Sequence, residues 1–191
     1  LQFEGVEDMS PEDQLRFLSA TAKNIASLLG YDIGGDDGKA VEVSLSSIFE
    51  YCISSKINLS GFRDVINILE DLPESIASSV NSVCSSRDLK ELSKKLNLLT
   101  MGARRLLFET GTPINIDMLL GLKKPNGKTR LSIIYLNTLH TAEEKEFFVS
   151  TITQQLYNWM LKNPLKDDKR ALQCGFFIDE VAPYIPPSNV K

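Results

Sequence analysis

The residues best suited to catalysis lie near the C-terminus, where an acidic pair follows an apolar run. Residues 174–178 are apolar or small, and Asp179 and Glu180 follow them directly. A nearly continuous apolar run predicts a strand buried on both faces. Such a strand would place the two carboxylates at the carboxyl end of a parallel sheet, where ligands of α/β sheets bind. There Asp179 could hold Mg²⁺ through its water shell, and Glu180 could polarise a water molecule that attacks a phosphate.

This arrangement is typical of the Walker B motif of P-loop ATPases, although an acidic pair can also simply end a strand and cap the next turn. A matching Walker A loop, GxxxxGK[ST], is absent from the sequence. Residues 34–40 lack its spacing and its Ser/Thr, and residues 121–129 are one residue too long and precede a predicted strand. A phosphate cradle requires a loop that runs into a helix N-terminus. We therefore expect half of an ATP site, which binds no nucleotide tightly alone.

The other candidates for chemistry are weaker. His140 is the only histidine, which excludes paired-His zinc sites, and it is expected at the start of a helix. The pairs Lys94-Lys95 and Arg104-Arg105 could touch phosphates, but a solvated helix face is the ordinary interpretation, and the helical half is acidic overall. The densest basic cluster, which could face DNA or solvent, consists of Lys123, Lys124, Lys128 and Arg130.

The composition limits the class of protein to which the chain can belong. The 191 residues are 42% hydrophobic and carry a net charge of −4, which are ordinary globular values. The apolar runs fall far short of the roughly 20 residues that cross a bilayer, and no signal peptide is recognisable. Three widely separated cysteines without CxxC spacing support neither a disulfide framework nor a zinc site, so a cytoplasmic location is expected. The first residue is Leu1 and not Met, which suggests part of a longer protein.

The first half of the chain is acidic and has helical periodicity. Residues 1–102 carry a charge of −7 and residues 103–191 carry +3, which together give the total of −4. Four apolar runs at helical spacing, each with a start signal, predict four short helices. The start signals are Ser10-Pro11, Ser44, Ser60 and Pro73-Glu74, and residues 34–38 are predicted to form a loop. A longer helix is predicted over residues 86–108, as part of a bundle or, alternatively, of an oligomeric coiled coil.

The second half has a different pattern. Residues 113–117 are predicted to be extended, and the apolar run 131–136 predicts a second buried strand. A capping box from Thr141 to Glu144 opens a predicted helix that reaches Lys162. Strand, helix and strand in about 50 residues predict a βαβ unit with two parallel strands and a right-handed crossover. The predicted fold class is therefore α/β, predominantly α: a helical bundle over residues 1–110 followed by a parallel βαβ unit over 111–191.

A family resemblance goes further than these patterns. The second half of the chain resembles bacterial and archaeal ATPases of the HerA/FtsK superfamily. Four segments carry the resemblance: the string from Phe176 to Pro187, residues 111–120, the apolar run 131–136 and the helix end Leu156-Tyr157-Asn158-Trp159. The resemblance covers about residues 105–187. Asp-Glu-Val-Ala stands here where the HerA branch often has Asp-Glu-Ala-His, which leaves the roles of Asp179 and Glu180 intact but weakens assignment to one branch.

The resemblance implies a partial RecA-like core with a helical insertion before it. It also implies ATP and Mg²⁺ as cofactors of the complete protein, with Asp179 as the cofactor-binding and metal-binding residue, through water, and Glu180 as the catalytic residue. A hexameric ring that moves along double-stranded DNA is implied, with a nuclease or another accessory protein as a further partner. The basic cluster would then face DNA in the ring pore.

Two hypotheses of different classes follow. The first is a fragment of a HerA/FtsK-like ATPase that couples ATP hydrolysis to DNA translocation or unwinding. The second is a non-catalytic helical interaction module on a degenerate α/β base. Under the first, the two strands are expected to be parallel and near each other, with Phe177 buried, Asp179 at an open strand end and unpaired edges where further strands are missing.

Overall fold

The structure is a computed structural model that describes residues 3, 6–109, 114–122, 128–164, 172–179 and 184. The chain divides into two compact units, residues 1–112 and residues 113–191, which are called unit 1 and unit 2 below. Among the described residues, no helix combines the length and the apolar composition that a membrane span needs.

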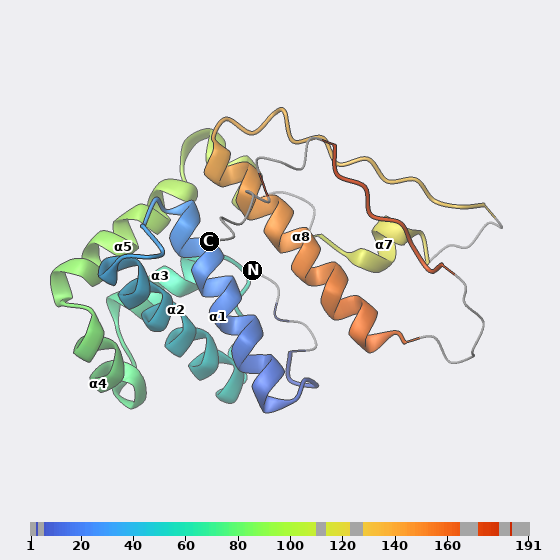
Figure 1. The fold of residues 1–191 in the computed structure, drawn as a ribbon. Coiled ribbons are helices and arrows are strands. Elements are labelled where there is room, and N and C mark those ends of the chain that lie inside the picture. Colours follow the sequence, from blue (N-terminus) through green and yellow to red (C-terminus); the bar gives the residue numbers. More distant parts are fainter. Residues whose placement is uncertain are drawn as a thin grey trace, which may run out of the picture. The chain divides into compact units, whose positions relative to one another are not determined.

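Unit 1 is made of helices joined by short connections (Figure 1). Helix α1 packs on α2, α2 packs on α4, and α3 packs on α5. The elements are α1 (Pro11–Leu28), α2 (Asp36–Ser54), α3 (Phe62–Glu70), α4 (Glu74–Val83), α5 (Ser86–Leu99), the 3₁₀ turn η1 (Gly102–Arg104) and α6 (Arg105–Phe108). The four short helices that periodicity predicted are thus confirmed.

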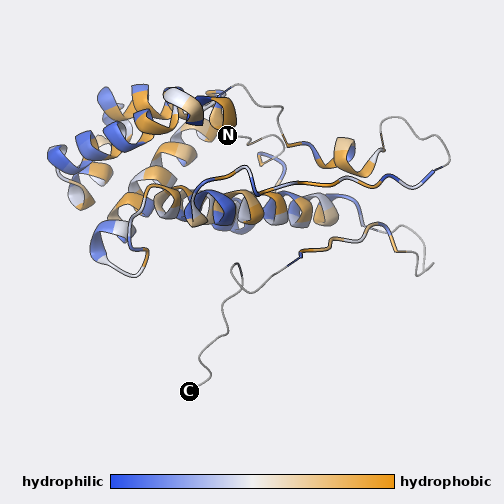
Figure 2. Cartoon of the chain, turned by 90° about the horizontal axis from the view of Figure 1, so that it is seen from above, coloured by the Kyte–Doolittle hydropathy of each residue, from blue (hydrophilic) through white to orange (hydrophobic). Residues whose placement is uncertain are grey.

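The core of unit 1 is built from the apolar face of each helix, which appears in Figure 2 as orange stripes beside blue ones. Fully buried side chains come from α1, α2 and α5 in particular: Leu18, Ile25, Leu45, Ile48, Phe49, Leu92, Leu96 and Leu99. With the buried Ala22 included, the positions on α1 and on α5 recur at intervals of three and four residues. On α2, Ile48 and Phe49 lie three and four residues after Leu45, so each of these helices turns one stripe toward the others. Burial of these apolar side chains supplies the main driving force for folding of the unit.

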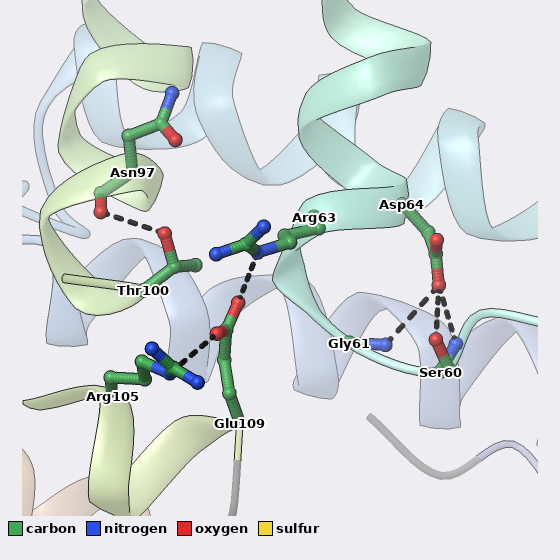
Figure 3. Close-up of polar contacts among 8 residues, drawn as sticks. All are labelled: Ser60, Gly61, Arg63, Asp64, Asn97, Thr100, Arg105 and Glu109. Carbon is green, nitrogen blue, oxygen red and sulfur yellow. Dashed lines mark hydrogen bonds and ion pairs between the residues drawn. The ribbon is translucent and has the colours of Figure 1, made fainter.

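Serine side chains cap the N-termini of α1 and α5, and a serine lies just before the glycine cap of α3. The Ser10 hydroxyl accepts a hydrogen bond from the backbone N–H of Asp13 at 3.2 Å, as the sequence predicted. At α3 the cap is Gly61, and the preceding Ser60 donates its hydroxyl to the Asp64 carboxylate at 2.7 Å (Figure 3). That hydrogen bond, together with those from the backbone N–H groups of Ser60 and Gly61, lowers the pKa of Asp64.

The lowered pKa makes α3 sensitive to acid. Because the folded-state pKa of Asp64 lies below its unfolded value, the stabilisation is complete above about pH 4 and is lost as the pH falls through the folded pKa. We expect thermal melts of Asp64→Asn to start from a lower melting temperature and to fall less between pH 5 and pH 3 than those of the unchanged chain. Identical acid dependence in the two proteins would show that other carboxylates dominate.

Two helix boundaries differ from the sequence prediction. Helix α2 begins at Asp36 and not near Ser44, because the acids of its first turn suit the positive end of the helix dipole. The predicted helix over 86–108 stops at Leu99, since Gly102 adopts a left-handed conformation with φ of 58°. Leu106, which lies within the predicted helix, is 68% exposed. The prediction of one continuous packed helix was therefore wrong beyond residue 99.

The start of α2 depends on a buried glycine, Gly38. A Cβ atom on this residue would lie 2.0 Å from the backbone oxygen of Asp32, which cannot move aside as a side chain would. We expect Gly38→Ala to lower the free energy of unfolding by about 1–3 kcal/mol, measured in urea. Gly34→Ala is the matched control, because the nearest atom to its Cβ would be a carboxylate oxygen at 3.5 Å. Equal stability of the two variants would contradict this interpretation.

The described residues of unit 2 form two helices, α7 (Ile116–Leu120) and α8 (Ala142–Lys162). The predicted helix start at Thr141 is confirmed: its hydroxyl accepts from the N–H of Glu144, and the buried Glu144 carboxylate accepts from the N–H of His140, the residue before the cap. The indole of Trp159 donates to the Asp117 carboxylate at 2.8 Å, which ties α8 to α7. The segment predicted to be extended around Asp117 is thus partly helical.

The predicted βαβ unit is not present. No strand or sheet occurs among the residues that the structure describes, so a partial RecA-like parallel βαβ unit is contradicted. The described residues of the two predicted strands, 131–136 and 174–178, have no regular secondary structure and form no ladder. The physical reason is that an apolar run specifies which side chains seek burial, whereas a strand also needs a neighbour for its backbone N–H and C=O groups.

Candidate functional site

The acidic pair is the first candidate site, and the structure describes one of its two members. Asp179 is exposed and lies in a turn directly after the segment 172–178. Glu180 lies outside the described residues. Within the part of the chain that is described, no group of three or more His, Cys, Asp or Glu side chains is placed to hold a metal ion.

The side chains that lead to Asp179 are not buried. Phe177 is 91% exposed and Leu172 is 88% exposed, so the expectation that Phe177 is buried was wrong for this chain. The other predicted strand behaves in the same way, because Leu131 and Ile133 are 80% and 81% exposed. We call residues 131–136 and 172–178 the two uncovered apolar segments. Nothing in the described part of the chain covers them as a strand of a buried sheet would be covered.

The basic cluster adjoins the end of α7. Lys123 and Lys124 lie outside the described residues, whereas Lys128 and Arg130 are exposed. The Arg130 guanidinium donates to the Ser132 hydroxyl at 3.3 Å, and that hydroxyl donates to the backbone oxygen of Leu119 at 2.7 Å. These contacts hold residue 130 beside the end of α7.

Residue 121, at the end of α7, lies close to residue 130. Gly121 ends α7 in the left-handed region with φ of 74°, and a Cβ atom there would lie 2.8 Å from the Cβ of Arg130. A left-handed conformation is rare for residues with a side chain, so glycine is required here for two independent reasons. The Gly-Lys-Thr string of residues 127–129 therefore follows a helix end and does not lead directly into a helix N-terminus.

Sequence reasoning missed a polar network in unit 1 (Figure 3). The carboxylate of Glu109, whose side chain is 16% exposed, pairs with Arg63 of α3 at 2.6 Å and with Arg105 of α6 at 3.7 Å. The pair Arg105 and Glu109 is visible in the sequence as an i, i+4 spacing, but Arg63 lies 46 residues away from its partner. One of the two arginines at 104–105 thus has a structural partner, which weakens its candidacy as a phosphate contact.

Two of the three cysteines are poor nucleophiles. Cys52 and Cys84 are buried free thiols, and burial raises the pKa of Cys52 to about 11 and also raises the pKa of Cys84. Cys174 is partly exposed. Since the thiolate is the reactive form, the two buried residues are unsuited to covalent catalysis.

We therefore expect one thiol to react with Ellman's reagent in the folded chain at pH 8, and three after denaturation. Cys174→Ser should abolish the fast phase, whereas Cys52→Ser should leave it unchanged. Rapid labelling of two or more thiols in the folded chain would show that unit 1 opens more easily than its burial indicates.

Comparisons with known protein families, with curated proteins and with solved structures found no match to this chain.

Proposed function

We propose that this chain is part of a HerA/FtsK-like ATPase that couples ATP hydrolysis to movement along double-stranded DNA. In this proposal unit 2 supplies the acidic half of the ATP site, and unit 1 is a helical insertion. The sequence resemblance over residues 105–187 is its basis, and one structural observation supports it. The apolar segment that ends at Asp179 is left uncovered in this chain.

The uncovered apolar segments need a partner. Burying a large apolar side chain contributes about 1.5–3 kcal/mol, and folded proteins seldom leave a contiguous apolar patch exposed without a binding role. Leu131, Ile133 and Phe177 each have more than three quarters of their surface exposed. A polypeptide segment that covers them would fulfil this need. In the proposed ATPase that segment also carries the Walker A loop that residues 1–191 lack.

The donor set suits the proposed chemistry. Mg²⁺ usually keeps several waters and is held in ATPases through one or two carboxylates together with phosphate oxygens, so one exposed aspartate at the site is a fitting contribution. In the complete site the ion would neutralise charge on the triphosphate. Asp179 would hold its water shell, and Glu180 would orient the attacking water molecule and draw a proton from it.

Nucleotide binding tests the proposal in two steps. By calorimetry, residues 1–191 alone should not bind Mg-ATP, because two carboxylates without the backbone amides and lysine of a P-loop repel the triphosphate. The complete protein should bind it and hydrolyse it faster with duplex DNA present. Tight binding by the isolated chain, or a complete protein without ATP hydrolysis, would contradict the proposal and favour a non-catalytic interaction module.

A further inference from the structure

One face of α5 in unit 1 carries a row of uncovered cations. Arg87, Lys90 and Lys94 are all exposed, and their spacing of three and four residues places them on one side of the helix. We call these three residues the α5 basic row. The other side of α5 is buried in the core of unit 1 through Leu89, Leu92, Ser93, Leu96 and Leu99. At 1.5 Å per residue, the row extends over about 10 Å.

The acids of α5 are engaged elsewhere. Asp88 accepts hydrogen bonds from the hydroxyl and the backbone N–H of Ser85, which lowers its pKa. Glu91 pairs with Lys95 at 3.6 Å, and Lys95 also lies over the ring of Tyr31 at 3.6 Å. Within the described residues, no ion pair joins the α5 basic row to an acid. The charges of Lys90 and Lys94 are therefore available to a partner, whereas the positive charge of Arg87 also helps to lower the pKa of the neighbouring Asp88.

The charge of unit 1 is segregated. Helix α5 has four cations and two acids, a net charge of +2. The remaining residues of 1–112 have seven cations and fifteen acids, a net charge of −8. A polyanion would be repelled by most of this unit and attracted at α5. The charge distribution would thus orient it onto one face.

We propose that the α5 basic row contacts the phosphate backbone of double-stranded DNA. The inference rests on the proposed function and assigns a DNA-contacting face to unit 1. A row of about 10 Å spans about three phosphates of one strand at 3.4 Å of axial spacing. A protein partner fits less well, because the centre of a protein interface is apolar and depleted of charge. Here the centre is cationic, and the exposed apolar residue Leu98 stands at one end.

Fluorescence anisotropy with a labelled 24-base-pair duplex tests this assignment on the 191-residue chain. The triple variant R87Q/K90Q/K94Q should bind at least about tenfold more weakly at 50 mM NaCl. The slope of log affinity against log salt should fall by about 2–3, because about 0.9 counterion is released per phosphate contact. The matched control K23Q/K39Q/K56Q removes the same charge from exposed positions of unit 1 outside α5 and should retain most of the affinity.

Several outcomes would overturn the proposal. These are no measurable DNA binding by the unchanged chain, equal losses in the two triple variants, or complete loss of binding in K123Q/K124Q/K128Q. If the α5 basic row instead binds polyglutamate but not DNA, the partner is an acidic protein and the assignment is wrong. ATP hydrolysis tests the proposed function separately from DNA binding. A defect in the acidic pair would impair hydrolysis but leave DNA binding by α5 unchanged.

Discussion

Replacing Glu180 with glutamine in the complete ATPase should lower kcat by about 10²–10⁴, the usual contribution of a general base. The amide keeps the shape of the carboxylate but cannot accept the proton of the attacking water molecule. Nucleotide binding should stay within about threefold of the unchanged protein, because Glu180 makes no contact with the triphosphate in this assignment. The measurement is steady-state ATP hydrolysis with duplex DNA, together with binding of a fluorescent ATP analogue.

A second substitution separates the two carboxylates. Asp179→Asn removes the charge that holds the ion's water shell, so it should weaken the Mg²⁺-dependent part of nucleotide binding as well as hydrolysis. Hydrolysis at the unchanged rate in Glu180→Gln, with DNA present, would mean that the acidic pair only ends a structural segment. The interaction-module hypothesis would then be preferred.

Adding charge to the uncovered apolar segments should convert a self-associating chain into a monomer. Both segments combine exposed apolar side chains with backbone that lies outside any helix or ladder, and such segments can pair between copies of the chain. We expect the unchanged chain to form oligomers at tens of micromolar, on the order of the concentrations at which such surfaces aggregate. The double variant I133K/F177K should elute at 21.3 kDa by light scattering.

The control for this experiment adds the same charge elsewhere. Leu15 and Val43 are also exposed, at 52% and 48%, but they lie on helices of unit 1. L15K/V43K should therefore associate as the unchanged chain does, and a monomeric control would show that net charge alone governs association. Phe177→Ala should change the free energy of unfolding by less than about 0.5 kcal/mol, because an exposed side chain leaves no cavity when it is shortened.

The helices of unit 1 were predictable because their information is local. Ser10 caps α1 through a hydrogen bond three residues away, and the apolar stripe of α5 repeats within 14 residues. The errors occurred where a tertiary contact decided the outcome. Gly38 reads as a loop residue, but its close approach to Asp32 belongs to the first turn of α2. Gly102 ended a predicted helix through a left-handed conformation that periodicity alone did not indicate.

The acidic pair shows what local sequence information does not predict. The sequence identifies Asp179 and Glu180 by type and by the apolar run before them. It does not specify the neighbours on which a strand depends, since these are backbone contacts with residues far away in the chain. Residues 131–136 and 174–178 therefore have strand-like sequences but lie outside any sheet in this structure. The ion pair of Arg63 with Glu109 was unpredictable for the same reason.

The hydrogen bond between Trp159 and Asp117 makes tryptophan fluorescence a probe of the folding of unit 2. Trp159 is the only tryptophan, and both residues lie in unit 2. The indole donates to a residue of α7 in the same unit, so tryptophan emission is expected to respond to unfolding of unit 2. Far-ultraviolet circular dichroism, by contrast, is dominated by the helices of unit 1. Denaturation curves from the two signals would superimpose only if the units unfold together, and their separation would measure the difference in stability between the units.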